Sequence, residues 1–172
     1  EKDVVLAFSL KLREKLLATG RYKVLMTRDS DAFIELDERR DFADRHNAAL
    51  FIAVHADYAG SQARGATVYS LRDSTMKELQ RSANREAANA DNVLTSDERI
   101  AVKKADGDVN AVASILSDLA QRDVAATKER TKVFTGSVVE FMGGSTNMMS
   151  NPDREANFRV LKSAKMPSVL IE

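Results

Sequence analysis

The chain has 172 residues, in which 26 lysines and arginines balance 26 aspartates and glutamates, and it contains no cysteine. Zero net charge argues against a general electrostatic attraction to nucleic acid or to anionic membranes, and the lack of cysteine excludes disulfides and thiolate zinc sites. A chain of this length, residues 1–172, is expected to form one domain with a substantial core. No apolar run approaches the roughly 18 residues that would span a membrane.

The first seventy or so residues alternate between helical and strand patterns. Apolar residues at helical spacing run from Val5 to Leu16, and Gly20 follows, a residue typical of helix C-termini. Asp37 is expected to cap a second helix that continues to about Asn47. The predicted strands are Tyr22–Thr27, the continuous apolar run Leu50–Ala56, and Gly65–Leu71. Strands that alternate with helices indicate βαβ units and a largely parallel sheet.

From Asp73 onward the pattern changes to long helical stretches. We expect one helix from Asp73 to about Ala90, and another that starts near Asp108 and continues, with or without a break, to Phe141. Between them, DNVLTSDERIAVKKADGD has no clear periodicity, and two short strands, FRVLK and SVLIE, close the chain. The sequence therefore predicts an α/β fold in three layers: a mostly parallel twisted sheet, helices on both faces, and a helical insert, residues 73–144, over the rim of the active site.

Two of the apolar strand patterns end in a side chain that can bind a metal ion. His55 follows LFIAV, and Glu172 follows SVLI. The carboxyl ends of parallel strands meet at one rim of a sheet, and Glu1, at the start of a helix, is expected there too. Imidazole and carboxylate groups are ligands that suit zinc. Because catalytic zinc uses three protein ligands and keeps one position for water, a further ligand is expected ahead of Glu1.

Each of these residues also has a purely structural interpretation. His55 can be a hydrogen-bonded residue at a strand end, Glu1 an acid placed for the helix dipole, and Glu172 the point at which a strand reaches water. The chain opens within a predicted helix and stops within a predicted strand, so we expect it to be a fragment of a longer protein. Residue types and spacing alone lead to a candidate metal site and no further.

Three separated blocks of sequence resemble the zinc-dependent N-acetylmuramoyl-L-alanine amidases of bacterial cell walls. An EK pair opens a helix, and the blocks that follow are GRYKVLMTRDSDAFIELDERRDFADRHNAALFIAVHAD, RGATVYSL and NPDREANFRVLKSAKMPSVLIE. The first block carries the family's threonine-arginine pair, leucine, helical arginine and asparagine-alanine pair, here Thr27-Arg28, Leu36, Arg40 and Asn47-Ala48. In the third block, a proline precedes an apolar strand that ends in glutamate. Together the blocks span nearly the whole chain.

The resemblance implies a role for each candidate residue. Glu1 and His55 match two zinc ligands of the family, and Glu172 matches its catalytic glutamate. The family's first zinc histidine lies upstream of the glutamate ligand, and this sequence does not contain it. One Zn²⁺ ion would polarise the substrate carbonyl and activate water. Glu172 would act as general acid and base in cleaving the amide between N-acetylmuramic acid and the L-alanine of the stem peptide. Because peptidoglycan lies outside the cytoplasm, a periplasmic enzyme is implied.

The region 73–144 resembles the helical insert of the Gram-negative division amidases, which implies autoinhibition and a role in cell separation. In those enzymes a glutamate of the insert occupies a zinc position until a partner displaces it, and within SANREAANADNV the best match is Glu86. A LytM-type activator that binds the insert is the implied partner. Glu98 is an alternative to Glu86, and either residue equally fits an exposed, charged helix face.

The sequence leaves the roles of several other residues, and two alternative functions, undecided. Arg28 and Arg40 either bind carboxylates of the substrate or form ion pairs within the fold, and His46 is expected on a helix surface. Two other functions are compatible with the sequence: another zinc hydrolase, such as a carboxypeptidase acting on cell-wall peptides, and a wall-binding module without activity. Release of stem peptides that begin with L-alanine distinguishes the first of these from an amidase, and the zinc content of the full-length protein distinguishes the second.

Overall fold

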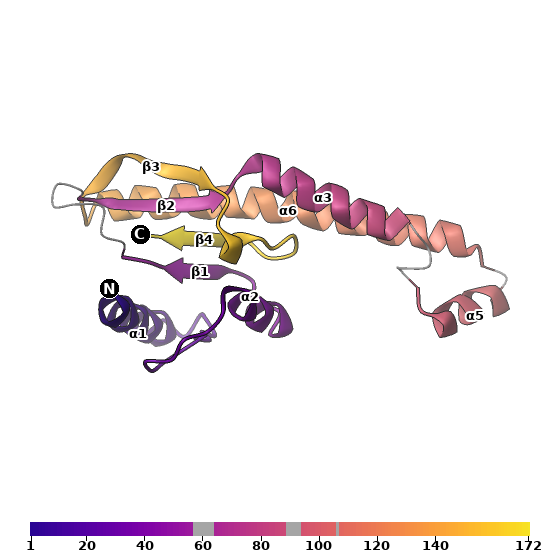
Figure 1. Ribbon diagram of the computed structural model, residues 1–172, viewed down its shortest axis with the longest axis horizontal. Helices are drawn as coiled ribbons and strands as arrows, with labels where there is room; N and C mark the ends of the chain where they lie inside the picture. The colour runs from indigo at the N-terminus through magenta and orange to yellow at the C-terminus, as the bar shows by residue number, and fades with distance from the viewer. Residues whose placement is uncertain (57–63, 89–93, 106) are drawn as a thin grey trace.

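The computed structural model describes residues 1–56, 64–88, 94–105 and 107–172 (Figure 1). Its strands are β1 (Phe51–Val54), β2 (Ala66–Leu71), β3 (Met148–Ala156) and β4 (Ser168–Ile171). Its helices are α1 (Lys2–Ala18), α2 (Leu36–Arg45), α3 (Asp73–Ala88), α5 (Ser96–Lys104) and α6 (Val109–Gly143), with the short 3₁₀ helix η1 (Arg159–Leu161) before β4.

The strands form one sheet in the order β1-β4-β2-β3. β1 pairs with β4 in parallel, and β2 pairs with β3 in parallel. The two pairs are joined by an antiparallel contact between β2 and β4. The sheet is therefore mixed, with two parallel pairs and one antiparallel pair, as expected of a mostly parallel sheet.

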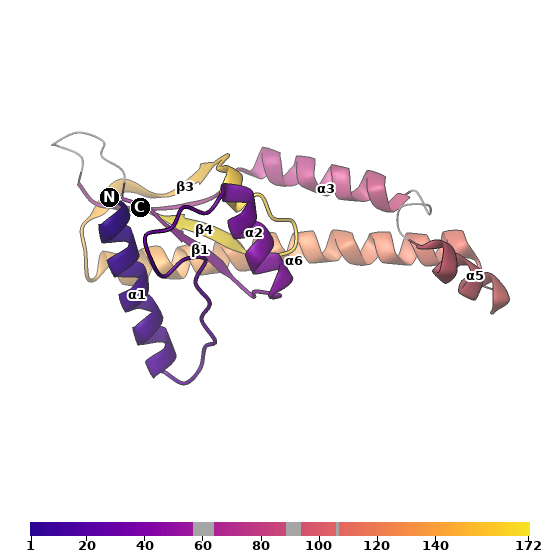
Figure 2. The ribbon, with the colours of Figure 1, turned by 60° about the horizontal axis from the view of Figure 1, so that its bottom comes forward.

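Helices cover both faces of this sheet. Figures 1 and 2 show α6 along one face and α2 on the other, near β1 and β4, while α1 lies beside the β1 edge. Val68 of β2 and Val169 of β4 are completely buried, and Leu161 of η1 is 1% exposed. The predicted three-layer α/β fold is confirmed, and its core lies where the central strands meet η1 and α6.

The helical insert extends away from the rim that it was expected to cover. β2 runs antiparallel to β4, so the chain leaves β2 at the end of the sheet opposite Glu172. There, α3 begins at Asp73, and the pair α3 and α6 extends past the sheet to α5 at the far tip (Figure 1). In this structure the insert therefore leads away from that rim and does not lie over it, because β2 runs antiparallel to the strand that ends in Glu172.

Several predicted elements are confirmed. The apolar run from Leu50 contains β1, and the long helix from Asp108 is continuous from Val109 to Gly143. Asp108 caps it, accepting a hydrogen bond from the Asn110 N–H. Gly20 follows α1 in a left-handed conformation (φ +66°), as predicted for a residue that ends a helix.

Other elements differ from the predictions. Residues 22–27 form no strand, and in the described part of the chain they pair with no neighbouring strand. A strand is stable only through the ladder it shares with a neighbour, so an apolar pattern alone does not produce one. FRVLK contributes η1 instead of a strand. The unpredicted β3 is an exposed edge strand, in which Pro152 is tolerated because one side of an edge strand needs no partner.

The aperiodic stretch before Asp108 contains an unpredicted helix, α5. Thr95 and Glu98 form a reciprocal capping box at its start, with the Thr95 side chain bonded to the Glu98 N–H and the Glu98 carboxylate bonded to the Thr95 N–H. The spacing Thr-x-x-Glu is a recognisable signal for a helix start. Residues 89–93, at the end of the predicted Asp73–Ala90 helix, lie outside the described part of the structure.

Candidate active site

His55 and Glu172 lie side by side at one rim of the sheet. Val54 of β1 is in register with Ile171 of β4, so the next residues of these parallel strands, His55 and Glu172, emerge together. The His55 N–H donates a hydrogen bond to the Ile171 carbonyl (2.8 Å). Glu172 is held from the other side by Thr67, whose N–H and carbonyl both bond its backbone (3.0 and 2.9 Å). Both residues are half-buried.

Glu1 lies at the N-terminal end of α1. It is the N-cap residue, and its carboxylate makes no capping hydrogen bond to the helix, so its side chain is not used to close the first turn. The side chain is exposed. Figures 1 and 2 both place the two ends of the chain, Glu1 and Glu172, next to each other at the rim where β1 ends. Residues far apart in the sequence therefore lie at one end of the sheet.

The donor groups at this rim fit zinc in kind but do not form a complete site. Carboxylate oxygen and imidazole nitrogen are both zinc ligands. Within residues 1–56, 64–88, 94–105 and 107–172, no three histidine, aspartate or glutamate side chains are gathered closely enough to hold a metal ion. A catalytic zinc site uses three protein ligands, and at this rim Glu1 and His55 are two residues whose side chains are of the required type.

The structure does not bring Glu86 to this rim. Its backbone belongs to α3, which leaves the sheet at the opposite end, and its side chain lies outside the described part of the structure. Glu98, the alternative, is engaged in the capping box of α5, where its carboxylate accepts hydrogen bonds from the N–H and hydroxyl of Thr95 (2.7 and 2.8 Å). These hydrogen bonds lower the pKa of Glu98, because they favour its charged form. Glu98 therefore has a structural role in this arrangement.

The arginines of the first block make contacts within the protein. Arg40, whose side chain is 25% exposed, pairs with Asp37 (3.4 Å) and Asp41 (3.3 Å). Asp37 also binds Arg159, and this bond lowers the pKa of Asp37. Arg28 donates hydrogen bonds to the backbone carbonyls of Lys2 and Ser30. For both arginines the structure shows contacts inside the fold, which is one of the two alternatives left open by the sequence.

His46 lies at the end of α2 and is exposed. Its Nδ1 lies 2.8 Å from the Phe42 carbonyl, an acceptor, so this nitrogen carries the hydrogen in that contact. The imidazole also packs against the Phe42 ring at 4.4 Å between ring centroids. These local contacts agree with the predicted surface position and leave His55 as the histidine of the rim.

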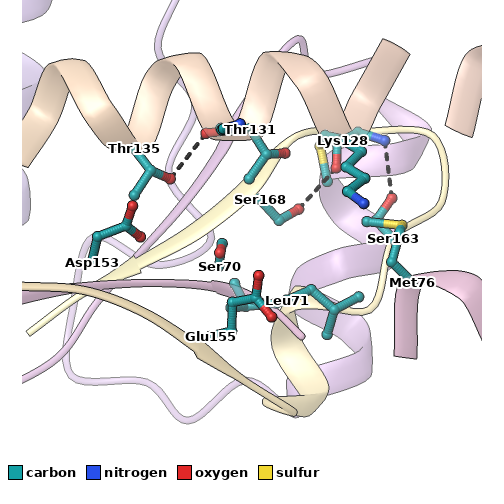
Figure 3. Close-up of a pocket in the computed structure, with 13 residues that line it drawn as sticks. Ser70, Leu71, Met76, Lys128, Thr131, Thr135, Asp153, Glu155, Ser163 and Ser168 are labelled. Atoms are coloured by element: carbon teal, nitrogen blue, oxygen red, sulfur yellow. Dashed lines mark hydrogen bonds between the residues drawn. The ribbon is translucent and has the colours of Figure 1, made fainter. Parts of the chain in front are cut away.

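A separate cavity of about 170 Å³ lies between α6 and the sheet (Figure 3). Hydroxyl groups and charges line it, among them Ser70, Lys128, Thr131, Thr135, Asp153, Glu155 and Ser168. The hydroxyls of Thr131 and Thr135 donate to carbonyls one turn earlier in α6 (2.8 and 2.9 Å), and Ser168 donates to the Met166 carbonyl. Such local bonds satisfy polar side chains inside a packed layer. Apolar side chains complete the lining, namely Leu71, Met76, Leu161 and Met166, and none of the rim residues Glu1, His55 and Glu172 belongs to it.

Comparison with known proteins identifies the family. All 172 residues match the Amidase_3 family model, which is described as N-acetylmuramoyl-L-alanine amidase. The chain belongs to this amidase family. The resemblance drawn from the sequence blocks is therefore confirmed at the level of the family.

Two Escherichia coli amidases are among its relatives. The chain is 33% identical over 173 residues to the N-acetylmuramoyl-L-alanine amidase AmiC of strain O6:H1, matching 100% of the chain and 39% of AmiC. It is 32% identical over 178 residues to AmiA of strain K12, matching 100% of the chain and 56% of AmiA. The amidase chain thus spans about half the length of these relatives.

A solved structure supports the fold. The CwlD amidase from Clostridioides difficile, solved in complex with the GerS lipoprotein, superposes with a TM-score of 0.52 at 18% identity, covering 100% of this chain and 68% of that one. At this identity the likeness concerns the fold alone. Within the described residues of the amidase chain, no helix combines the length and apolar character needed to cross a membrane.

Proposed function

We propose that the protein hydrolyses peptidoglycan at the amide between N-acetylmuramic acid and the L-alanine of the stem peptide. The observation that carries this proposal is the pairing of His55 with Glu172 at the carboxyl ends of two adjacent parallel strands, in a chain that matches the amidase family from end to end. Crevices beyond such strand ends are where α/β folds place their ligands. Peptidoglycan lies outside the cytoplasm, so an extracytoplasmic, periplasmic location belongs to the same proposal.

In this proposal Glu1 and His55 are two ligands of one Zn²⁺ ion. When bound, zinc supplies Lewis-acid polarisation of the amide carbonyl and lowers the pKa of the attacking water to about 7. The hydrogen bond from the His55 N–H to the Ile171 carbonyl holds the backbone that carries the imidazole, and the bond from the Val5 N–H to the Glu1 carbonyl holds that of Glu1. In this proposal Glu1 and His55 bind and orient the ion, and they transfer no proton.

Glu172 moves the protons. Its carboxylate takes a proton from the attacking water and delivers it to the nitrogen of the departing L-alanine, so that the C–N bond breaks without expelling an amide anion. General acid–base catalysis of this kind contributes about 10²- to 10⁴-fold. The backbone of Glu172 is bonded to Thr67 in both directions, which limits the movement of its Cα while the side chain acts.

The test of this function uses the full-length protein and purified sacculi. An amidase releases stem peptides that begin with L-alanine and leaves the glycan strands intact. Glu172→Gln should lower the rate about 10²- to 10⁴-fold while zinc is retained, and Glu140→Gln, a change at an exposed position of α6, should leave it unaltered. Release of single amino acids from the peptide ends would instead identify a carboxypeptidase. Absence of both products, with well under one zinc per chain, would identify an inactive wall-binding module.

We further propose that residues 73–144 regulate this activity in cell division, and that Glu86 is the residue that blocks the metal. Support comes from the sequence of the insert and from its form, a long pair of helices joined to the sheet at the base of α3. In the described arrangement α3 leads away from His55, so blocking requires a second position of the insert. A LytM-type protein is the proposed activator. The CwlD structure was solved with a lipoprotein partner, which shows that an amidase of this fold can be held in a protein complex.

A further inference from the structure

The helix that carries Glu1 is held at its first turn by polar bonds. None of the residues of α1 is buried, and its apolar side chains Val4 and Phe8 are 65% and 49% exposed. Apolar packing therefore contributes little to the position of this helix in the described structure. A ligand at its N-terminus still has to be placed accurately, since metal sites depend on the groups that orient their ligands.

Two contacts from the segment 28–31 hold that first turn. Arg28 donates one hydrogen bond to the carbonyl of Lys2 (3.1 Å) and another to the carbonyl of Ser30 (3.0 Å). Asp31 forms an ion pair with the Lys2 ammonium group (2.5 Å). Arg28 is half-buried, and its guanidinium group can bridge the two carbonyls because its donors are arranged in a rigid fork. Both contacts end on Lys2, the residue next to Glu1.

The segment 28–31 is in turn tied to the sheet through α2. Arg39 of α2 donates to the Ile34 carbonyl (2.8 Å), just after this segment. Asp37 of α2 binds Arg159 of η1 (3.1 Å), and the buried Leu161 of η1 belongs to the core beneath β4. These separate contacts, joined by the intervening chain and by the packing of η1 in the core, lie between Lys2 and the strand that ends in Glu172. Glu1 and Glu172, at the two ends of the proposed site, are thus both positioned relative to the core that contains Leu161.

We propose that Arg28 and Asp31 are positioning residues, which hold the first turn of α1 so that Glu1 stays at the rim where His55 and Glu172 also lie. This inference rests on the proposed function, because it takes Glu1 as a zinc ligand. It assigns Arg28 to the protein and not to the carboxylates of the substrate. Loss of either residue should therefore weaken zinc binding, since groups that orient metal ligands typically account for about 10- to 100-fold in metal affinity.

The experiment measures zinc affinity of the full-length protein by competition with a chromophoric chelator, together with the thermal midpoint of the zinc-free protein. Arg28→Gln and Asp31→Asn should each lower the affinity about tenfold or more. Arg122→Gln serves as the matched control, because it removes another exposed ion pair, with Asp118 (2.8 Å), far along α6. The midpoints of all three zinc-free variants should agree, and Asp31→Glu, which keeps the charge, should bind zinc nearly as well as the unchanged protein.

Glu1→Gln separates this inference from the function on which it rests. If Glu1→Gln loses zinc while Arg28→Gln and Asp31→Asn bind it within about threefold of the unchanged protein, the positioning role is overturned and the ligand stands. If Glu1→Gln itself binds zinc normally, the proposed ligand set fails and the positioning role fails with it. A midpoint for Arg28→Gln well below that of Arg122→Gln would assign Arg28 to general stability, which also overturns the inference.

Discussion

Substitution by alanine should change the stability of the fold in opposite directions at Gly65 and at Gly136. Gly65 precedes β2 with φ +114°, and a Cβ there would lie 2.8 Å from the Met148 carbonyl carbon of β3. Gly136 lies inside α6, where a Cβ meets no atom within 4 Å. The first position needs glycine for both its conformation and the close approach of β3, whereas the second weakens a helix interior without any such need.

Gly65→Ala should therefore destabilise the fold by about 2 kcal/mol or more, from backbone strain and crowding together. Gly136→Ala should stabilise it by about 0.5–1 kcal/mol, because alanine has less freedom to lose on folding. Urea unfolding of both variants measures these changes directly. Equal effects of the two substitutions would mean that β3 does not approach Gly65 as closely as the structure shows.

At the scale of elements, Asp73 joins α3 to two neighbours. Its carboxylate binds Lys128 of α6 and Lys77 of α3 (2.8 Å to Lys77), and its N–H donates to the Glu155 carboxylate of β3 (3.1 Å). The hydrogen bonds from Lys128 and Lys77 lower the pKa of Asp73 from 3.8 to about 2. The base of the insert is thus fixed by one carboxylate that stays charged in moderately acidic solution.

This lowered pKa gives stability a defined dependence on pH. A carboxyl group whose pKa is depressed by folding contributes its full stabilisation above its unfolded pKa, here 3.8, and loses it as the pH falls through the folded pKa of about 2. Asp73→Asn should therefore be less stable than the unchanged protein at pH 5, by the small amount typical of exposed pairs. The difference should decrease as the pH falls below 3.8 and disappear only below the folded pKa of about 2, as measured by urea unfolding at each pH. A difference that is constant over this range would show that the Asp73 charge is not the cause.

Some of the strands and helices could be predicted from the sequence and others could not. The ends of β1 and β4 were predictable because a buried strand that stops at a polar residue is a local pattern, and parallel strands bring such ends together. α5 was equally predictable from its Thr95–Glu98 capping box. β3 was not, because an exposed edge strand with Pro152 has no apolar alternation to detect. The direction of β2 against β4 depends on contacts between distant segments, so no local pattern in Gly65–Leu71 contains it.

At the scale of the whole molecule, the antiparallel pairing of β2 with β4 decides where the insert lies relative to the rim. It sends α3 away from the rim, while the returning α6 runs back along the sheet toward the end that holds Glu172 (Figure 2). α6 is one continuous helix of 35 residues, so the insert and the layer that packs on the sheet share one helix. A partner that binds the insert therefore acts on a helix that also packs against the sheet.

Glu86→Ala tests whether the insert ever reaches the rim. If a second position of α3 places the Glu86 carboxylate on the metal, the open ligand position is filled there and water activation stops. Without that carboxylate, the position of α3 that blocks the metal loses the contact that stabilises it, so fewer molecules adopt it. The rate on sacculi without an activator should therefore rise about tenfold or more. Glu78→Ala, an exposed change on the same helix, should leave the rate unaltered. An unchanged or lower rate for Glu86→Ala would mean that control of the activity does not pass through this carboxylate.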